Sequence, residues 1–153
     1  MKAVIQRVEN AFVSVDDKIT GKIERGLLVY IGVAHNDTEK DADWLAEKTA
    51  HLRIFNDTEG KMNLSLNDLN ADGIKTGVLA VSQFTLLCDA RKGRRPSWGG
   101  AASPEIAKQL YLYFIEKIKK QGLICETGEF QAHMKVTYTN DGPVTILLDS
   151  NAV

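Results

Sequence analysis

Short apolar runs separated by turn-forming residues dominate the first third of the chain. The pattern predicts strands over residues 3–8 and 11–15 around a turn at Glu9-Asn10, followed by a hairpin over residues 18–26. Residues 27–33, LLVYIGV, are apolar without alternation, which is typical of a strand buried on both faces. We therefore expect this run to lie in the centre of a sheet.

The rest of the chain carries further strand patterns. The predicted strands are residues 52–55, 62–66, 77–87, 123–127 and 144–149. From Phe130 to Thr139, apolar and polar residues alternate without a break. This period-two pattern is typical of a half-buried strand and is the clearest strand signal in the sequence.

Two segments have the start signals and the apolar spacing of helices. In the first, residues 36–38 offer N-caps for a helix through His51, with an apolar face of Ala42, Leu45, Thr49 and Leu52. The second starts at residues 103–105, Ser-Pro-Glu, an N-cap followed by a proline and an acid in the first turn. It runs to Gln121, where Gly122 ends it, and its apolar residues are Ile106, Leu110, Phe114 and Ile118.

Two helices against many hairpin-linked strands indicate an α+β fold. We expect a mostly antiparallel sheet, or a partly closed barrel, with two main helices packed on it. The chain of 153 residues fits a single domain over residues 1–153. Its length allows a core that needs no disulfide or metal, and we expect neither a metal nor another cofactor.

Composition and charge narrow the possible compartments and partners. Apolar residues make up 44% of the chain and charged residues 25%, and the net charge is −1, so any nucleic-acid contact must come from a local basic patch. Cys88 and Cys125 form no metal or disulfide pattern. The longest apolar run, residues 27–34, is too short to span a bilayer, and the start has no apolar signal segment. We expect a cytoplasmic protein without a membrane partner.

The basic loop over residues 88–102 is a candidate for nucleic-acid binding. It carries Arg91, Lys92, Arg94 and Arg95 close to glycines and to Trp98. Such a segment suits phosphate contacts, and the indole could stack on a base or a ribose. The alternative is a solvated loop whose charges serve solubility.

Polar residues interrupt the predicted strand over residues 77–87 at SQFT, residues 82–85. Ser82 or Thr85 could act as a nucleophile or orient a substrate, but neither lies in a nucleophile-elbow motif. The alternative is a polar solvent face of the strand. Cys88 follows this segment and could pair with His133 in a Cys–His hydrolase, although a lone cysteine after an apolar strand is more often a small core residue.

The segment TNDGPVT, residues 139–145, places Gly142-Pro143 where a returning strand should begin. A trans proline that ends a turn is the ordinary interpretation. Alternatively, a rigid Gly-Pro can direct main-chain carbonyls outward with no side chain to shield them. Such carbonyls suit a site that recognises what many ligands share and ignores what varies.

Seven segments, in chain order, closely resemble the D-aminoacyl-tRNA deacylase family, formerly called D-Tyr-tRNA deacylases. They are MKAVIQRV, GLLVYIGV, RIFND, GKMNLSL, VSQFTL, KGRRPS and TNDGPVT. The resemblance covers essentially the whole chain, and SQFT together with GPVT is its most specific part. The sequence departs from common family patterns at Cys88, Trp98 and Gln131.

The resemblance implies a homodimeric hydrolase that removes D-amino acids, and mischarged glycine, from the 3′ end of tRNA during translation. It implies a cis Gly142-Pro143 that enters the partner's active site and excludes L-amino acids. The implied pocket residues are Ser82, Gln83, Phe84, Thr85, Phe130, Ala132 and Met134, and the implied tRNA contacts are Arg91, Lys92, Arg94 and Arg95. The expected partners are tRNA and a second copy of the chain, and not DNA.

The resemblance also implies a mechanism without a catalytic triad. Main-chain N–H groups near Gln83 and Phe84 are expected to hold the ester carbonyl, because an activated ester can be hydrolysed with oxyanion donors alone. The 2′-hydroxyl of the substrate ribose could assist water, and Thr85 as a covalent nucleophile is the alternative.

Overall fold

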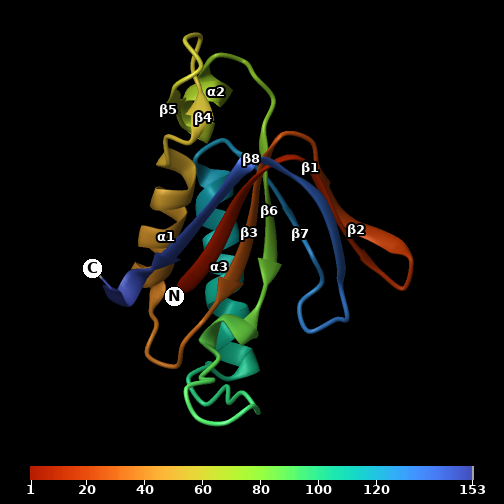
Figure 1. Cartoon of the computed structure of the whole chain (residues 1–153), viewed down its shortest axis with the longest axis vertical. Coiled ribbons are helices and arrows are strands. Elements are labelled where there is room, and N and C mark those ends of the chain that lie inside the picture. Colours follow the sequence, from red (N-terminus) through yellow and green to blue (C-terminus); the bar gives the residue numbers. More distant parts are fainter. Residues whose placement is uncertain (153) are drawn as a thin grey trace.

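The computed structural model describes residues 1–152, and its centre is a curved sheet of six strands (Figure 1). Five strands follow the order β2-β1-β3-β6-β7, and β8 pairs with β1. The strands are β1 (Lys2–Val15), β2 (Lys18–Ile23), β3 (Gly26–Gly32), β6 (Gly77–Ser82), β7 (Ile124–Thr127) and β8 (Lys135–Asp149). The predicted α+β barrel-like class is confirmed, while residue 153 of the predicted domain lies outside the described residues.

The first strand is continuous, so the predicted turn at Glu9-Asn10 is wrong. Residues 2–8 of β1 pair with β3, residues 11–15 pair with β2, and β8 pairs along both halves. The register with β8 shifts twice between Gln6 and Asn10. Such shifts bend a strand locally without reversing the chain, which explains why a polar pair occurs in the middle of a long strand.

The first hairpin joins β1 to β2, so the predicted hairpin over residues 18–26 is also wrong. The chain reverses at Asp16-Asp17, whose φ angles of 47° and 61° are both left-handed. Aspartate tolerates this conformation, and two such residues are typical of a two-residue hairpin turn. β2 and β3 are therefore separated by β1 instead of paired with each other.

Two of the five strand pairings in this sheet are parallel, which the sequence interpretation did not anticipate. β3 pairs with β6, and β6 with β7, in parallel. Parallel neighbours need long crossover connections. Helix α1 (Glu39–His51) lies in the connection from β3 to β6, and helix α3 (Pro104–Lys120) lies in that from β6 to β7. The two helices lie beside each other against the same face of the sheet (Figure 1).

Both long helices begin and end as predicted. Thr38 is the N-cap of α1 and Ser103 that of α3, and Gly122 follows α3 with a φ of +80°. The predicted apolar faces are buried, except that Leu52 is half-buried and Ile106 is exposed. Within residues 1–152, no helix combines the length and the hydropathy that crossing a bilayer would need.

The segment between α1 and β6 contains a helix that was not predicted. The predicted strands there shrink to β4 (Phe55–Asn56) and β5 (Met62–Leu64). Helix α2 (Leu66–Ala71) follows, and it ends the strand predicted over residues 62–66. The 3-10 turn η2 (Ser150–Ala152) ends the described chain.

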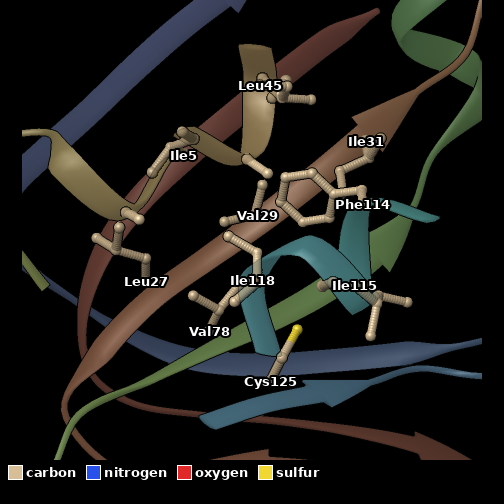
Figure 2. Packing of buried hydrophobic residues seen from close by; sticks show 14 of the residues in the cluster. Ile5, Leu27, Val29, Ile31, Leu45, Val78, Phe114, Ile115, Ile118 and Cys125 are labelled. Atoms are coloured by element: carbon tan, nitrogen blue, oxygen red, sulfur yellow. The ribbon is translucent and has the colours of Figure 1, made fainter. Parts of the chain in front are cut away.

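The core has two parts because the central strand is buried on both faces, as predicted. Leu27, Val29 and Ile31 of β3 face the helices, where Phe114 and Ile118 of α3 pack against them (Figure 2). The alternate face contributes to a second cluster inside the barrel: Val8, Ala11, Val13, Ile23, Leu28, Leu79 and Val81. This double burial accounts for the continuous apolar run.

The barrel closes where β2 approaches β7. A Cβ atom on Gly21 would lie 2.3 Å from the main-chain oxygen of Thr127, so only glycine allows this approach. The long curved β8 pairs with β1 along the edge that faces away from β2 and β3 (Figure 1).

Candidate active site

A cavity of about 480 Å³ lies at the end of the barrel where β3 and β6 finish. This is in the range of small-molecule sites. Three further segments complete it: the base of the basic loop, the first turns of α3, and residues 130–134. The lining residues are Ile31, Val33, Ser82, Gln83, Phe84, Ala101, Ala102, Pro104, Ala107, Tyr111, Phe130, Gln131, Ala132 and Met134.

The SQFT segment enters the cavity because β6 ends earlier than predicted. The strand stops at Ser82, and residues 84–87 form a 3-10 turn, η1, so the strand predicted to residue 87 is wrong at its end. Gly32 of β3 makes room for this turn, since a Cβ there would lie 2.5 Å from Cδ2 of Leu87. The close packing of η1 on β3 turns Phe84 out of the sheet and into the cavity wall.

Three of the four predicted SQFT residues line the cavity, and Thr85 does not. The N–H of Gln83 donates to the carbonyl of Ile31 at 2.7 Å, so it is already engaged. Phe84 and Thr85 begin η1, and no acceptor within residues 1–152 is assigned to their N–H groups. The first N–H groups of a helical turn have no partner inside it, so they can bind a ligand oxygen.

Residues 130–134 fold over the cavity, and β8 starts only at Lys135, so the strand predicted from Phe130 is wrong at its start. Gln131 has a left-handed φ of 65°, and the N–H of Ala132 donates to the carbonyl of Glu129 at 3.2 Å, which makes a turn. Phe130, Ala132 and Met134 nevertheless line the cavity. Their role in binding substrate, which the resemblance implied, stays a prediction.

Sequence reasoning missed Tyr111, which lines the cavity from α3. Its hydroxyl donates to the carbonyl of Ala80 at 2.8 Å, and its ring packs on Phe130 with centroids 6.0 Å apart. Burial raises the pKa of Tyr111 well above its ordinary value, so the hydroxyl stays protonated. The spacing of Tyr111 from Phe114 and Ile118 on the apolar face of α3 could have predicted that its side chain is buried against the sheet.

Gly142 and Pro143 do not line this cavity, and their peptide bond is cis. They are exposed in an irregular part of β8, where Asn140 pairs with Val8 and Thr145 pairs with Gln6. Four residues of β8, 141–144, therefore lie opposite one residue of β1, Arg7. This four-residue bulge interrupts the regular pairing of β8 with β1 and contains the Gly-Pro motif.

The bulge is held by the almost fully buried side chain of Arg7. Its Nε lies 2.9 Å from Oδ2 of Asp141, and its Nη1 donates to the carbonyl of Ile54 at 2.5 Å. The side chain of Asn140 donates to the carbonyls of Arg7 and Val144 at 2.9 and 3.2 Å. These contacts fix both ends of the segment that presents Gly142 and Pro143.

The basic loop is a pinched protrusion beside the cavity. The backbones of Asp89 and Ser97 exchange two hydrogen bonds, at 2.7 and 2.9 Å, so residues 90–96 project from that point. Arg91 pairs with Asp89 at 2.7 Å, which lowers the pKa of that carboxyl well below its usual range. Among the described residues, the other predicted phosphate contacts, Lys92, Arg94 and Arg95, form no ion pair.

The structure gives little support to a Cys–His site. Cys88 is exposed after η1, and His133 is exposed in the 130–134 segment; neither lines the cavity. No hydrogen bond in the described part of the chain joins them. Residues 1–152 also contain no group of three His, Cys, Asp or Glu side chains arranged to hold a metal ion.

Comparison with known proteins identifies relatives over almost the whole chain. A family model described as D-Tyr-tRNA(Tyr) deacylase matches residues 4–149. A D-aminoacyl-tRNA deacylase of Thermosipho melanesiensis is 58% identical over 154 residues, which cover 100% of this chain and 99% of that protein.

Two solved structures share the fold over almost the whole chain. One is described as a c-Myc DNA unwinding element binding protein and superposes with a TM-score of 0.88 at 38% identity, over 97% of this chain and 98% of the other. The second is described as a probable eukaryotic D-amino acid tRNA deacylase. Its TM-score is 0.79 at 18% identity over 96% of this chain and 97% of the other, so it supports the fold alone.

Proposed function

The chain belongs to the D-Tyr-tRNA(Tyr) deacylase family and is a D-aminoacyl-tRNA deacylase, a hydrolase of aminoacyl-tRNA esters; from this premise we propose that the cavity binds the aminoacylated 3′ end of tRNA and that the enzyme proofreads chirality in translation. This activity acts on aminoacyl-tRNA, so we place the protein in the cytoplasm. We expect no DNA or membrane partner, although one structural relative carries a DNA-element name.

The observation that carries the proposal is the composition of the cavity. Ser82, Gln83 and Phe84 meet Phe130, Ala132 and Met134 there, although the two groups lie far apart in the sequence. Aromatic and apolar side chains with a few polar groups suit a terminal nucleoside, whose base stacks while its ribose and ester make hydrogen bonds.

We assign the main-chain N–H of Phe84, a residue that lines the cavity, to the ester carbonyl. The N–H of Gln83 cannot serve in the same way, because it already donates to the carbonyl of Ile31. Hydrogen bonds to the developing oxyanion lower the barrier, and aminoacyl esters are already activated. The attacking water would be assisted by the 2′-hydroxyl of the substrate ribose, so no catalytic triad is required. Covalent attack by Thr85 is disfavoured by its place outside the cavity lining.

Chirality would be read by Gly142 and Pro143 of a second copy of the chain. Gly142 and Pro143 do not line the cavity of the chain to which they belong. They are exposed on a bulge that the Arg7–Asp141 ion pair holds in place, which suits their insertion into the cavity of a second copy. Outward main-chain carbonyls would contact the α-carbon region and leave no space for an L side chain. A rigid clash discriminates more strongly than apolar contact with a small group, which gives about 1–3 kcal/mol.

This steric filter explains a broad substrate range. A D side chain would point away from the carbonyls into solvent, so its identity matters little. Glycine has no side chain to reject, and we therefore propose that glycine mischarged on tRNA is also hydrolysed.

A homodimer through the outer surface of β8 would bring the two sites together. Within residues 1–152, β8 pairs with β1 alone, so its other edge has no strand partner. Leu147 on this strand is 76% exposed, the largest fraction among the exposed large apolar residues. An unpaired strand edge with an exposed apolar side chain is a typical surface for association.

The test is paired deacylation of D-Tyr-tRNA and L-Tyr-tRNA. We expect the D ester to be hydrolysed and the L ester to survive. Equal hydrolysis of both, or of neither, would contradict the proposal. A noncatalytic RNA-binding protein would bind tRNA in a salt-sensitive manner and leave the ester lifetime unchanged.

The same assay separates the proposal from the Cys–His alternative. Cys88→Ala should abolish a Cys88/His133 hydrolase. We expect it to leave the D-Tyr-tRNA rate within about twofold, because the thiol does not reach the cavity.

A further inference from the structure

We propose that Phe84 and Trp98 form a stacking platform for the nucleotide that precedes the terminal adenosine of tRNA, with Lys92, Arg94 and Arg95 contacting phosphates of the same strand. The inference rests on the proposed function, since it takes the aminoacylated 3′ end to enter the cavity. It assigns a substrate-binding surface outside the cavity itself.

The two aromatic side chains are exposed and in contact. Phe84 is 57% exposed and Trp98 is 40% exposed, and they are the aromatic members of the exposed large apolar set within the described residues. Their ring centroids are 5.8 Å apart at an interplanar angle of 62°. Burial of these apolar rings would stabilise a monomer, so their joint exposure indicates a surface for a ligand.

The platform continues the cavity outward. Phe84 belongs to both, because it also lines the cavity. Trp98 lies three residues before Ala101, whose N–H donates to the Trp98 carbonyl at 3.0 Å. Ala101 lines the cavity too. A chain whose last nucleoside occupies the cavity would therefore pass over these rings as it leaves.

Charge favours a nucleic acid over an apolar protein segment as the occupant. The platform adjoins the loop tip of residues 90–96, where Arg91 is neutralised by Asp89. Three cations remain there in a chain whose net charge is −1. Unpaired nucleotides combine a base that stacks on aromatic rings with a phosphate that binds Lys or Arg. The unpaired 3′ end of tRNA offers this combination.

The experiment compares two substrates for Trp98→Ala. With D-Tyr-tRNA, we expect kcat/KM to fall about tenfold, mainly through KM, because one base loses its stacking partner. With D-tyrosyl-adenosine, which lacks the preceding nucleotide, we expect no change. The D-tyrosyl ester of cytidylyl-adenosine should regain sensitivity, and Trp98→Phe should retain most of the tRNA activity.

Met62→Ala is the matched control, because Met62 is likewise an exposed large apolar residue, at 59%, but lies on β5 and does not line the cavity. An equal loss with both substrates would show a structural effect and overturn the inference. If Trp98→Ala loses no activity with D-Tyr-tRNA or with D-tyrosyl-adenosine, the inference is overturned. It is also overturned if the variant changes the oligomeric state and its activities with the two substrates do not differ. If wild-type protein leaves D-Tyr-tRNA intact, the proposed function itself fails.

The cations are tested by the salt dependence of KM for D-Tyr-tRNA. Replacing Lys92, Arg94 and Arg95 by alanine should reduce the slope of log KM against log salt by about 2, as expected for three contacts to a single strand. Lys75→Ala, an exposed lysine outside the cavity lining, should leave the slope unchanged. An unaltered slope in the triple variant would overturn the phosphate assignment.

Discussion

Single residues decide how the Gly-Pro motif is presented. Gly142 has a φ of +118°, which L side chains rarely adopt. A Cβ there would lie 2.8 Å from Cγ2 of Val144 and 3.0 Å from Nη2 of Arg7. The glycine therefore allows the buried guanidinium and the bulge to approach each other.

We expect Gly142→Ala to weaken both D-Tyr-tRNA hydrolysis and the rejection of L-Tyr-tRNA. The ratio of the D-Tyr-tRNA hydrolysis rate to the L-Tyr-tRNA hydrolysis rate should fall by at least about tenfold. The added methyl must displace the motif or enter the ligand's space. The paired deacylation assay measures this ratio.

Gly60→Ala is the matched control for that substitution. Gly60 also has a left-handed φ, +77°, but nothing lies within 4 Å of its Cβ position. It should lose about 1 kcal/mol of stability and keep the D/L ratio. If Gly142→Ala leaves the D/L rate ratio unchanged, Gly142 does not contribute to the rejection of L-amino acids.

At the scale of elements, α2 shows how a short local motif positions a helix. Ser65 is the buried N-cap: its hydroxyl donates to Oδ2 of Asp68 at 2.6 Å and accepts from the Asp68 N–H at 3.2 Å. The Ser65 N–H also donates to Asp68 Oδ2, at 2.8 Å. Such a reciprocal box satisfies two donors at the start of a helix.

Ser65→Ala should lower the free energy of unfolding by about 1 kcal/mol at pH 7. Hydrogen bonds from Ser65 lower the pKa of Asp68 in the folded protein. Their stabilisation is therefore present above the ordinary carboxyl pKa and is lost as the pH falls through the lowered folded value. The difference between wild type and variant should shrink below about pH 4 in denaturant titrations.

Asp68→Asn tests the cause of this pH dependence. The amide cannot titrate, so Ser65→Ala in that background should cost the same at pH 7 and at low pH. A cost that still shrank with falling pH would assign the effect to another carboxyl.

At the scale of the whole molecule, the proposed active site belongs to two chains. One copy supplies the cavity with the N–H of Phe84, and the other supplies Gly142 and Pro143. In a symmetric dimer, each half therefore contributes to both sites.

Mixing two variants, each impaired in the part that one chain contributes to a site, tests this arrangement. Phe84→Pro deletes the proposed N–H donor at the first position of η1, where proline is tolerated. Refolded together with Gly142→Ala, it should restore about one quarter of the wild-type sites, because half of the dimers are mixed and each has one intact site. Mixed dimers that form without regaining activity would exclude delivery across the interface.

Much of the local structure follows from the sequence for a physical reason. Caps, glycine stops and apolar spacing act over a few residues, so Thr38, Ser103 and Gly122 bound their helices as predicted. The double-sided burial of β3 follows from its continuous apolar run. The S-x-x-D box at Ser65 was an equally local signal for α2 that the strand pattern concealed.

The sequence by itself determined the types of the long helices and of the main strands, the boundaries of the long helices, the family resemblance and six of the residues that line the cavity. Only the tertiary structure decided that β1 is continuous, that β6 gives way at Ser82 to η1 packed against Gly32 of β3, and that Tyr111 lines the cavity. It also decided that Arg7 holds the bulge before Gly142. Local patterns constrain the backbone of neighbouring residues, whereas these features depend on contacts between segments far apart in the chain, which no short pattern encodes.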